Sequence, residues 1–481
     1  MLLPAKFVRR LIRSQLQKTR PEKLFRLGEK KLMLAFRRAA NKSAAYRVLL
    51  EEAGVNSQSI TTARDFARLC PILEKSNTFQ RFPLDKLIAD DVQLSQLASV
   101  LTSSGHGGGG FALGLSTRAQ FKSTPSMIDL GLELAFDIDS RRTLLINCLP
   151  MGVTFQSDAV CVANVSVRED MACAIVEQAG ALFEQIILCG DPLFLKKLCD
   201  YSQEKKLDWS RYRMNLIIGE ETFTESFRDY LAQVLQIAPD QPKGGLIGSS
   251  MGIGELGLNI FNETRETIAW RRACNSNRDL CTLLFGSAYH TLPTFLVFNP
   301  MRSFVEIDAV DEHGVGDLLV SILDTGTPIP LMRYKTGDRA RWLSTAELEL
   351  ALRESGMNLS IPRLPMIALL GRAKDRLPDG GHVDEYKHAL YQDPELAVHV
   401  SGAFRLSKSD SNGGMLWEVQ IRQGDDTDIG MLTSRMSRLL PATSGDTNHT
   451  NSTTLICYKF EDFPYGKTID YERKFVYWKS N

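Results

Sequence analysis

The sequence has no net charge, no long hydrophobic run and no regular cysteine pattern. Its 481 residues include 57 Lys and Arg against 57 Asp and Glu, so no electrostatic argument favours nucleic-acid binding. No apolar stretch approaches the roughly 20 residues that a transmembrane segment requires. The nine cysteines are odd in number and loosely spaced, which is typical of reduced thiols. We therefore expect a cytoplasmic protein.

The sequence also lacks the ligand spacing of a zinc site. Cys274, Cys281 and His290 lie near one another in the chain, but their spacing fits no tetrahedral pattern. The start of the chain lacks acids: residues 2–20 hold six Lys and Arg beside several apolar side chains. Two interpretations stay open for this segment, a helix packed on its own protein or a helix at a membrane surface.

The periodicity of apolar residues predicts an α/β protein with two or more domains. Residues 1–70 have helical spacing, and residues 97–300 alternate short apolar runs with helix-like segments, which favours largely parallel sheets. The segment from Thr222 to Ile237 has the pattern of a helix with a threonine cap. Beyond residue 300 the chain is β-rich, with strands expected at 304–308 and 317–322. A smaller unit follows, with a helix at 383–391 and strands at 416–421 and 455–458.

A small-residue loop follows the apolar run at 97–101. It reads Thr-Ser-Ser-Gly-His-Gly-Gly-Gly-Gly over residues 102–110. Backbone N–H groups and hydroxyls of such a loop can surround phosphate oxygens, because no Cβ atoms block their approach. It is not a Walker A loop, since no Gly-Lys-Ser/Thr follows. The alternative interpretation is a flexible glycine linker.

Further motifs follow in a fixed order along the chain. They are Gly219-Glu220-Glu221, Met251-Gly252-Ile253-Gly254-Glu255, Arg333-Tyr334-Lys335-Thr336-Gly337-Asp338, Gly371-Arg372-Ala373-Lys374-Asp375 and Pro464-Tyr465-Gly466-Lys467. In this order and at these separations they resemble the adenylate-forming superfamily, and within it the phenylacetate-CoA ligase and coenzyme F390 synthetase branch. The resemblance implies a large N-terminal domain (1–373) of α/β subdomains plus a β-rich section. It also implies a small, mobile α+β C-terminal domain (374–481).

The resemblance also implies a role for each matching residue. The phosphate loop corresponds to Ser103, Ser104, Gly105 and Gly107, and the adenine-facing turn to Gly219, Glu220 and Glu221. Met251 and Gly252 stand where the family has an aromatic–glycine pair over adenine, and Glu255 where it has a glutamate that binds Mg²⁺. Asp338 would accept both ribose hydroxyls, Arg372 would contact the ribose and phosphate, and Lys374 would be the hinge. Lys467 would bridge the carboxylate and the α-phosphate, with Lys474 as the second candidate.

The implied activity is ATP-dependent activation of a small carboxylic acid, followed by transfer to a thiol. The cofactors would be ATP, Mg²⁺ and coenzyme A, with a carrier protein as an alternative acceptor and a homodimer as one assembly. The sequence departs from the family pattern in the phosphate loop, where the second threonine and the following Pro-Lys are missing. A degenerate member that only binds a nucleotide is therefore a second interpretation.

A third interpretation is a serine esterase of the α/β-hydrolase type. His106 to Gly109 match an oxyanion-hole motif, and Gly248 to Gly252 match Gly-x-Ser-x-Gly around Ser250. Asp308 or Asp324 with His313 would complete a triad. The esterase interpretation leaves the segments around Asp338 and Arg372 unexplained.

Overall fold

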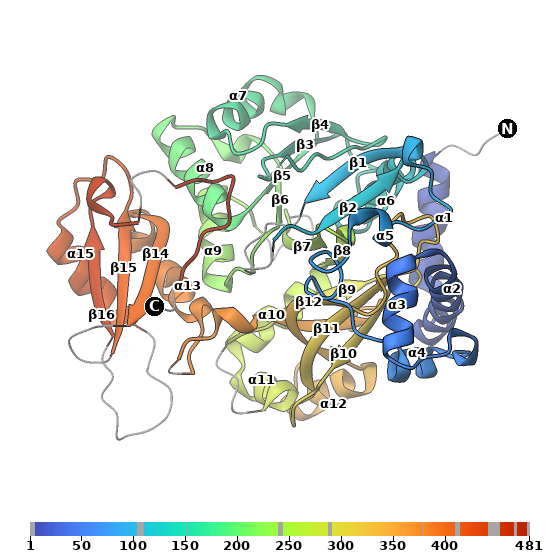
Figure 1. The fold of residues 1–481 in the computed structure, drawn as a ribbon. Coiled ribbons are helices and arrows are strands. Elements are labelled where there is room, and N and C mark those ends of the chain that lie inside the picture. Colours follow the sequence, from blue (N-terminus) through green and yellow to red (C-terminus); the bar gives the residue numbers. More distant parts are fainter. Residues whose placement is uncertain are drawn as a thin grey trace.

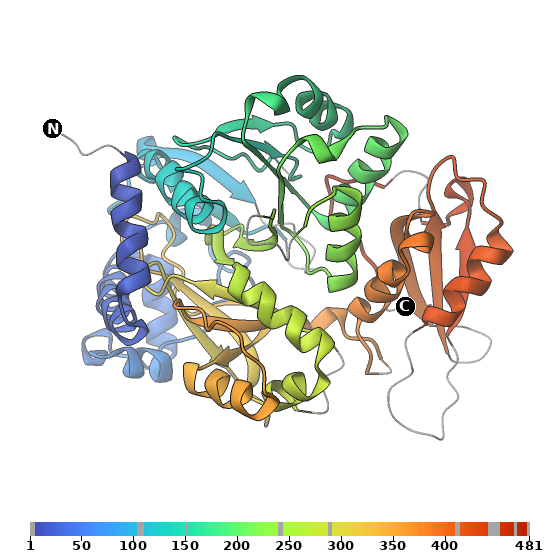
Figure 2. The same cartoon turned by 180° about the vertical axis from the view of Figure 1, so that it is seen from behind.

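The computed structural model describes residues 5–102, 110–150, 152–238, 244–286, 291–378, 380–408, 414–440, 453–465 and 469–478. Three parts make up the molecule (Figure 1): a group of N-terminal helices, an eleven-stranded sheet with its helices, and a small unit built on a three-stranded sheet. The small unit lies at the opposite end of the molecule from the N-terminal helices (Figure 2).

The N-terminal section is helical, as the sequence predicts. It contains α1 (Ala5–Lys18), α2 (Pro21–Lys42), α3 (Ala44–Glu52), α4 (Ala63–Leu69) and α5 (Leu84–Leu87). The Ser43 side chain begins α3 by accepting a hydrogen bond from the Tyr46 N–H. The ring of Phe36 on α2 packs at 6.3 Å from Tyr46 and 5.5 Å from Phe66. These aromatic contacts join α2, α3 and α4 into one core.

One half of the large sheet is parallel, in the order β7-β6-β5-β3-β4. Its strands are β3 (Thr143–Asn147), β4 (Cys161–Asn164), β5 (Gln185–Gly190), β6 (Met214–Ile218) and β7 (Ile247–Ile253). One face packs against α7 (Glu169–Ala179), α8 (Pro192–Glu204) and α9 (Glu225–Val234), and the other against α6 (Arg118–Phe136). Because helices cover both faces, the central strands β3, β5 and β6 are continuous buried runs.

The other half of the large sheet is antiparallel and includes the predicted β-rich section beyond residue 300. Within residues 97–300 the predicted parallel pairing holds for β3 to β7, whereas the strands at 257–262 and 294–298 pair antiparallel. Its strands are β8 (Gly257–Asn262), β9 (Thr294–Phe298), β10 (Ser303–Asp308), β11 (Val315–Ile322), β12 (Tyr334–Leu343) and β13 (Met366–Arg372). Helices α10 (Arg265–Ser276), α11 (Arg278–Phe285) and α12 (Thr345–Ser355) cover it, and β1 (Leu97–Thr102) with β2 (Leu113–Thr117) forms a separate hairpin. The parallel pairing changes to antiparallel at β7–β8, since a short turn joins these strands and leaves no room for a crossover helix.

The small unit is an α+β structure in the order β14-β15-β16. It consists of β14 (Val400–Lys408), β15 (Met415–Ile421) and β16 (Thr454–Tyr458), with α13 (Val383–Gln392), α14 (Pro394–Ala397) and α15 (Ile429–Met436). The strands and the helix predicted here are confirmed. Residues 469–478 return beside β14, where the Leu406 N–H donates to the Tyr477 carbonyl. The described residues also contain seven short 3-10 helices: Ser57–Ser59, Leu94–Gln96, Gly180–Leu182, Trp209–Arg211, Ala373–Asp375, Ser437–Leu439 and Phe460–Asp462.

The small unit packs on the large sheet through α13 and α9. The ring of Tyr391 lies 4.6 Å from Phe227 and 5.4 Å from Tyr230, and the Ser226 hydroxyl donates to the His388 carbonyl. The N-cap of α9 is Thr224 rather than Thr222, because the Thr224 side chain accepts the Phe227 N–H. The domain boundary at 373/374 stays a prediction.

Candidate functional site

One cavity of about 2590 Å³ lies between the large sheet and the small unit. It exceeds the usual volume of a small-molecule pocket and therefore has room for two substrates at once. Ten of the residues singled out from the sequence line it: Gly219, Glu220, Glu221, Met251, Gly252, Glu255, Asp338, Arg372, Lys374 and Lys474. Ser103, Ser104, Gly105, Gly107 and Lys467 lie outside the described residues. Thr102, which ends β1, also lines the cavity.

The turn at Gly219 follows β6 at the carboxyl end of the parallel strands. The Gly219 N–H donates to the Gly190 carbonyl at the end of β5, which holds the turn beside the neighbouring strand. Glu220 has a φ of 67°, in the left-handed region that few residues other than glycine adopt. Such strained backbone is concentrated at functional sites. The two glutamates therefore stand where ligands commonly bind in this type of sheet.

Each of these glutamates binds a lysine from the C-terminal part of the chain. The Lys474 ammonium lies 2.8 Å from the Glu220 carbonyl oxygen and 3.0 Å from its carboxylate. Lys387 on α13 lies 3.2 Å from the Glu221 carboxylate and also approaches Asp384. Burial lowers the pKa of Lys387, but the charges of Glu221 and Asp384 outweigh that effect and raise it. The turn is thus the point at which the small unit meets the cavity.

Met251 and Gly252 lie at the end of β7, and Glu255 lies in the turn that leads to β8. Met251 pairs with Phe261 across the two strands, and its half-buried side chain packs against the apolar layer beneath the sheet. A Cβ atom on Gly252 would lie 3.0 Å from the Leu258 Cα, so only glycine fits this turn without a shift. These close contacts fix the position of Glu255 at the end of the turn.

Glu255 binds the hydroxyl of Tyr334, which belongs to another motif. The Tyr334 hydroxyl donates to the buried Glu255 carboxylate over 2.5 Å. This uses one carboxylate oxygen, and the second is left for a ligand. Among the described residues no group of three His, Cys, Asp or Glu could hold a metal. A hard cation at Glu255 would therefore take its other ligands from phosphate oxygens and water, as Mg²⁺ commonly does.

Asp338 and Arg372 face each other across the β12–β13 pair. They are register partners, and the Arg372 Nε–H lies 3.4 Å from the Asp338 carboxylate. Asp338 is 7% exposed, and its N–H donates to the Thr336 hydroxyl. A buried carboxylate beside a guanidinium at a cavity wall can accept hydroxyl groups and contact an anion at the same point.

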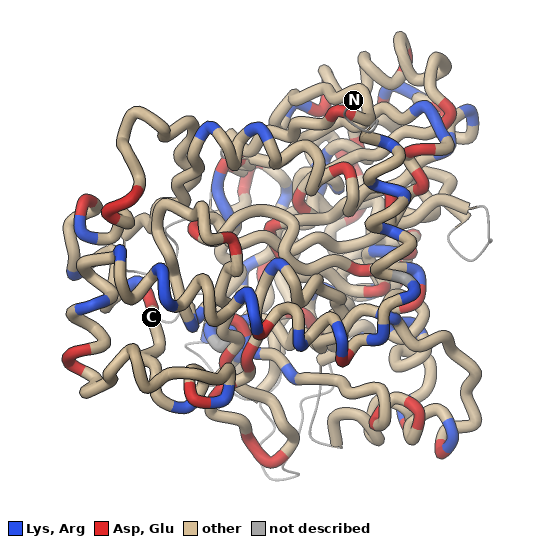
Figure 3. The backbone as a smooth tube through the Cα atoms, turned by 90° about the vertical axis from the view of Figure 1, so that its right-hand side faces the viewer, with Lys and Arg blue, Asp and Glu red and all other residues tan. Residues whose placement is uncertain are grey.

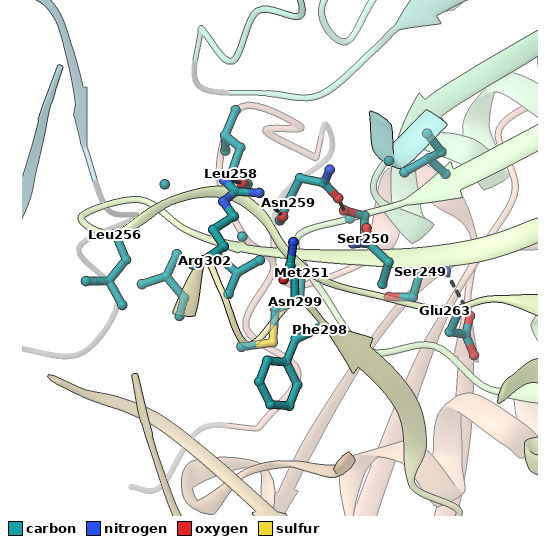
Figure 4. A pocket seen from close by; sticks show the side chains of 18 of the residues that line it. Ser249, Ser250, Met251, Leu256, Leu258, Asn259, Glu263, Phe298, Asn299 and Arg302 are labelled. Atoms are coloured by element: carbon teal, nitrogen blue, oxygen red, sulfur yellow. Dashed lines mark hydrogen bonds between the residues drawn. The ribbon is translucent and has the colours of Figure 1, made fainter. Parts of the chain in front are cut away.

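The esterase interpretation does not fit this geometry. Ser250 lies inside β7, which continues to Ile253 and turns into β8, whereas a nucleophile elbow needs a strand followed by a helix. The Ser250 hydroxyl donates to Asn259 over 3.2 Å (Figure 4). His313 is not among the described residues that line the cavity, and His106 lies outside the described part of the chain. The Gly-x-Ser-x-Gly match is thus a strand–turn–strand segment.

The cysteines of the chain are free thiols. All nine lie in the described part of the chain, and none of them forms a disulfide bond. Cys274 and Cys281 are neighbours on α10 and α11, but His290 lies outside the described residues. None of the described helices combines the length and apolar character of a membrane span.

Sequence reasoning missed two contacts at the cavity, those of Lys387 and Tyr334. Lys387 is one of many lysines in amphipathic helices, and nothing in its local sequence marks it. Tyr334 lies in the motif from Arg333 to Asp338, and its position in that motif could have indicated that it lies at the site. Asp191 was also missed, although it directly follows the buried run at β5. It caps α8 through the Leu193 and Phe194 N–H groups.

Comparison with known proteins gives structural matches only. No protein-family model matches the chain, and no curated sequence matches it. A crystal structure of 2-hydroxyisobutyryl-CoA ligase in the postadenylation state matches with a TM-score of 0.64 and 13% identity, covering 96% of this chain and 89% of that one. The acyl acid amido synthetase AtGH3.15 matches with a TM-score of 0.57 and 14% identity, covering 100% and 96%.

Different states of the same ligase match to different degrees. Its open conformation gives a TM-score of 0.53 at 12% identity, covering 96% of this chain and 91% of that one. The thioesterification state gives 0.52 at 13%, with 91% and 90% covered. Both values are lower than the 0.64 of the postadenylation state.

These matches cover both the large sheet and the small unit, so the two parts together have a known architecture. The chain has the fold of the adenylate-forming enzymes.

Proposed function

We propose that this protein activates a carboxylic acid with ATP to form an acyl-adenylate and then transfers the acyl group to a thiol. One observation carries the proposal: Glu255, the Asp338–Arg372 pair and Lys474 come from distant parts of the chain, and all line one cavity. The reaction needs an oxygen ligand for Mg²⁺, an acceptor for the ribose hydroxyls and a positively charged side chain near the phosphates. Glu255, Asp338 and Lys474 would supply these groups in that order. The acceptor thiol is coenzyme A in the phenylacetate-CoA ligase resemblance, and a carrier-protein thiol is the alternative.

In the first step a carboxylate oxygen attacks the α-phosphorus of ATP. The bond from the α-phosphorus to the bridging oxygen breaks, and pyrophosphate leaves with the electron pair. Mg²⁺ at Glu255, when bound, would neutralise charge on the phosphates. The Asp338 carboxylate would accept the ribose hydroxyls and so hold the nucleotide in register, while Arg372 contacts the phosphate side.

A lysine is needed where charge develops on the α-phosphate. The sequence motif assigns this role to Lys467, and that assignment stays a prediction. Lys474 supports a second assignment, since its ammonium already lies at the cavity wall beside Glu220. Before the second step the small unit would turn about Lys374, withdraw the lysine and present another face to the thiol. The thiol then loses its proton and its sulfur bonds to the acyl carbon, while the bond from that carbon to the phosphate oxygen breaks and AMP leaves.

The function is tested by ATP–pyrophosphate exchange over a panel of aryl and fatty acids, with each acid also assayed for coenzyme A thioester. We expect acid-dependent exchange with at least one class, and its loss in Asp338→Ala. The altered phosphate loop favours a second candidate, a protein that binds ATP without reaction. ATP binding in calorimetry with no exchange for any acid would establish that candidate.

A further inference from the structure

Two arginines of the first helix, α1, face the protein interior. Arg9 on α1 is buried, and its guanidinium lies 2.5 Å from Asp139 and 3.4 Å from Asp129. Arg13, one helical turn later, bonds to Glu133 and lies 2.9 Å from Asp137. Asp129 and Glu133 belong to α6. These ion pairs fix the rotation of α1 about its own axis.

Because these two arginines face inward, three apolar residues of α1 face solvent, whereas Leu16 is buried. Phe7 is 53% exposed, Leu11 is 48% exposed, and Val8 lies beside them. Phe7 and Leu11 are four residues apart, so they lie one above the other on the helix. In the usual surface helix such an apolar pair packs on the protein, so its exposure here is unusual.

Helix α2 also exposes apolar side chains on its outer side. Leu27 and Leu34 are exposed, and they are seven residues apart, so they share one face. Lys23 and Lys30 flank them at the same spacing on that face. The outer sides of α1 and α2 thus both combine exposed leucine or phenylalanine side chains with basic residues.

The exposed charges of α1 and α2 have almost one sign. Ten exposed residues of residues 5–42 are basic and two are acidic, although the whole chain has no net charge. The basic residues are Lys6, Arg10, Lys18, Arg20, Lys23, Arg26, Lys30, Lys31, Arg37 and Lys42, and the acidic ones are Glu22 and Glu29. Both helices lie on the side of the molecule that Figure 3 turns toward the viewer.

We propose that the outer face of α1 and α2 docks on a bilayer surface that contains anionic lipid. Exposed apolar side chains interleaved with Lys and Arg match the two layers of such a surface, acyl chains below and negative headgroups above. A second copy of the chain does not match, because two identical basic faces repel each other. A nucleic acid offers phosphates but no apolar layer to cover Leu11, Leu27 and Leu34.

One end of the cavity reaches the outer side of α2. Its lining extends from Glu220 and Lys474 to the exposed Lys31 and Leu34 on α2, and also to the half-buried Ile12 and the buried Leu16 on α1. Docking of α1 and α2 therefore brings one end of the cavity to the lipid. If the proposed function holds, an amphiphilic acid can pass from the bilayer into the cavity. The docking itself does not depend on catalysis, so vesicle binding tests it separately.

Vesicle sedimentation with the full chain tests the proposal. We expect binding to vesicles of phosphatidylcholine mixed with phosphatidylglycerol, much weaker binding to pure phosphatidylcholine, and release by salt. The double variant Lys23→Gln/Lys30→Gln should lose roughly 30-fold in affinity for the anionic vesicles. Phe7→Ser/Leu11→Ser should lose about 10- to 100-fold.

The matched control is Val310→Ser together with Leu350→Ser, two exposed apolar residues outside α1 and α2. The control should bind vesicles like the unmodified chain, and circular dichroism should show all variants folded. Absence of vesicle binding, or equal losses in the control, overturns the proposal. A change of oligomeric state in Phe7→Ser/Leu11→Ser during sedimentation velocity, without vesicle binding, would assign the face to self-association instead. Retention of the chain on DNA with no vesicle binding would overturn it as well.

Discussion

The Tyr334 hydroxyl donates a hydrogen bond to the Glu255 carboxylate over 2.5 Å and so joins two motifs 79 residues apart in the chain. Burial raises the pKa of Tyr334, and the negative charge of Glu255 raises it further. The tyrosine therefore stays protonated and remains a donor across the physiological pH range. The bond orients one oxygen of a carboxylate that lines the cavity.

Tyr334→Phe should destabilise the protein and weaken its use of Mg²⁺. Loss of a hydrogen bond to a buried carboxylate costs about 1.5–3 kcal/mol, because the charge is left without its donor. We expect a lower midpoint in urea denaturation and a several-fold higher Mg²⁺ requirement in pyrophosphate exchange. Tyr230→Phe is the control, since the buried Tyr230 hydroxyl has no hydrogen-bond partner among the described residues. Equal effects of the two variants would contradict the role given to Tyr334.

Lys474→Ala should lower the rate of acyl-adenylate formation by ~10²–10³-fold, which corresponds to loss of one electrostatic contact in the transition state. Transfer to the thiol from a supplied acyl-adenylate should be largely retained. Quenched-flow measurement of pyrophosphate release separates the two steps. Lys467→Ala is made in parallel: if it alone removes adenylation, the C-terminal motif is right and Lys474 only holds the small unit.

Asp338→Ala should weaken ATP binding by roughly 10- to 150-fold, since two ribose hydroxyls would lose their shared charged acceptor. Titration calorimetry with ATP measures the change directly. Asp317→Ala is a suitable comparison, because Asp317 lies on the neighbouring strand and binds Lys335 at 2.6 Å. It is not among the described residues that line the cavity. An ATP affinity indifferent to Asp338 would remove the nucleotide from this wall of the cavity.

Ser250 should not react with a serine-directed fluorophosphonate, and Ser250→Ala should leave any p-nitrophenyl ester turnover unchanged. Its hydroxyl donates to Asn259, and no hydrogen bond joins it to a histidine within the part of the chain that the structure describes. Mass spectrometry of the labelled chain reads the outcome. Stoichiometric labelling at Ser250 would restore the esterase interpretation.

Asp191→Asn should stabilise the protein above neutral pH. Burial raises the pKa of Asp191 to about 7, against the lowering effect of the Phe194 N–H, and the charges of Glu221 and Glu220 add to the increase. The folded protein therefore holds this proton more tightly than the unfolded chain does, and stability falls as pH rises from about 4 through about 7. The asparagine keeps the cap of α8 without the charge. We expect a gain of roughly 2–4 kcal/mol at pH 8 that disappears near pH 4, measured by urea denaturation.

Many residues of the candidate cavity could be singled out because their motifs lie on strands or directly after them. Gly219 to Glu221 extend β6, Met251 to Glu255 end β7, and Asp338 and Arg372 lie on paired strands. A short apolar run next to polar residues indicates such a place, and adjacent strands bring their ends together. The half of the sheet after β7 could not be assigned its direction, since apolar runs look alike in parallel and antiparallel pairs.

Contacts that depend on long-range packing could not be predicted. The rotation of α1 is one example: its apolar residues form a plausible inner stripe, but the carboxylates of Asp129 and Glu133, more than a hundred residues away, bind its arginines instead. The pairing of Lys387 and Lys474 with Glu221 and Glu220 is another. It depends on where the small unit docks, and no local pattern encodes that position.

If the nucleotide binds at Glu220 and Glu221 as proposed, it shares these two residues with the small unit. The proposed adenine-facing turn also holds Lys474 and Lys387, so occupancy of the turn and docking of the small unit draw on the same two carboxylates. Thermodynamic reciprocity then applies: a ligand that strengthens docking must itself bind more tightly to the docked form, by the same factor. Under the proposed function, the position of the small unit would then report whether a nucleotide is bound. A nucleotide titration that moved one without the other would show the two equilibria to be independent.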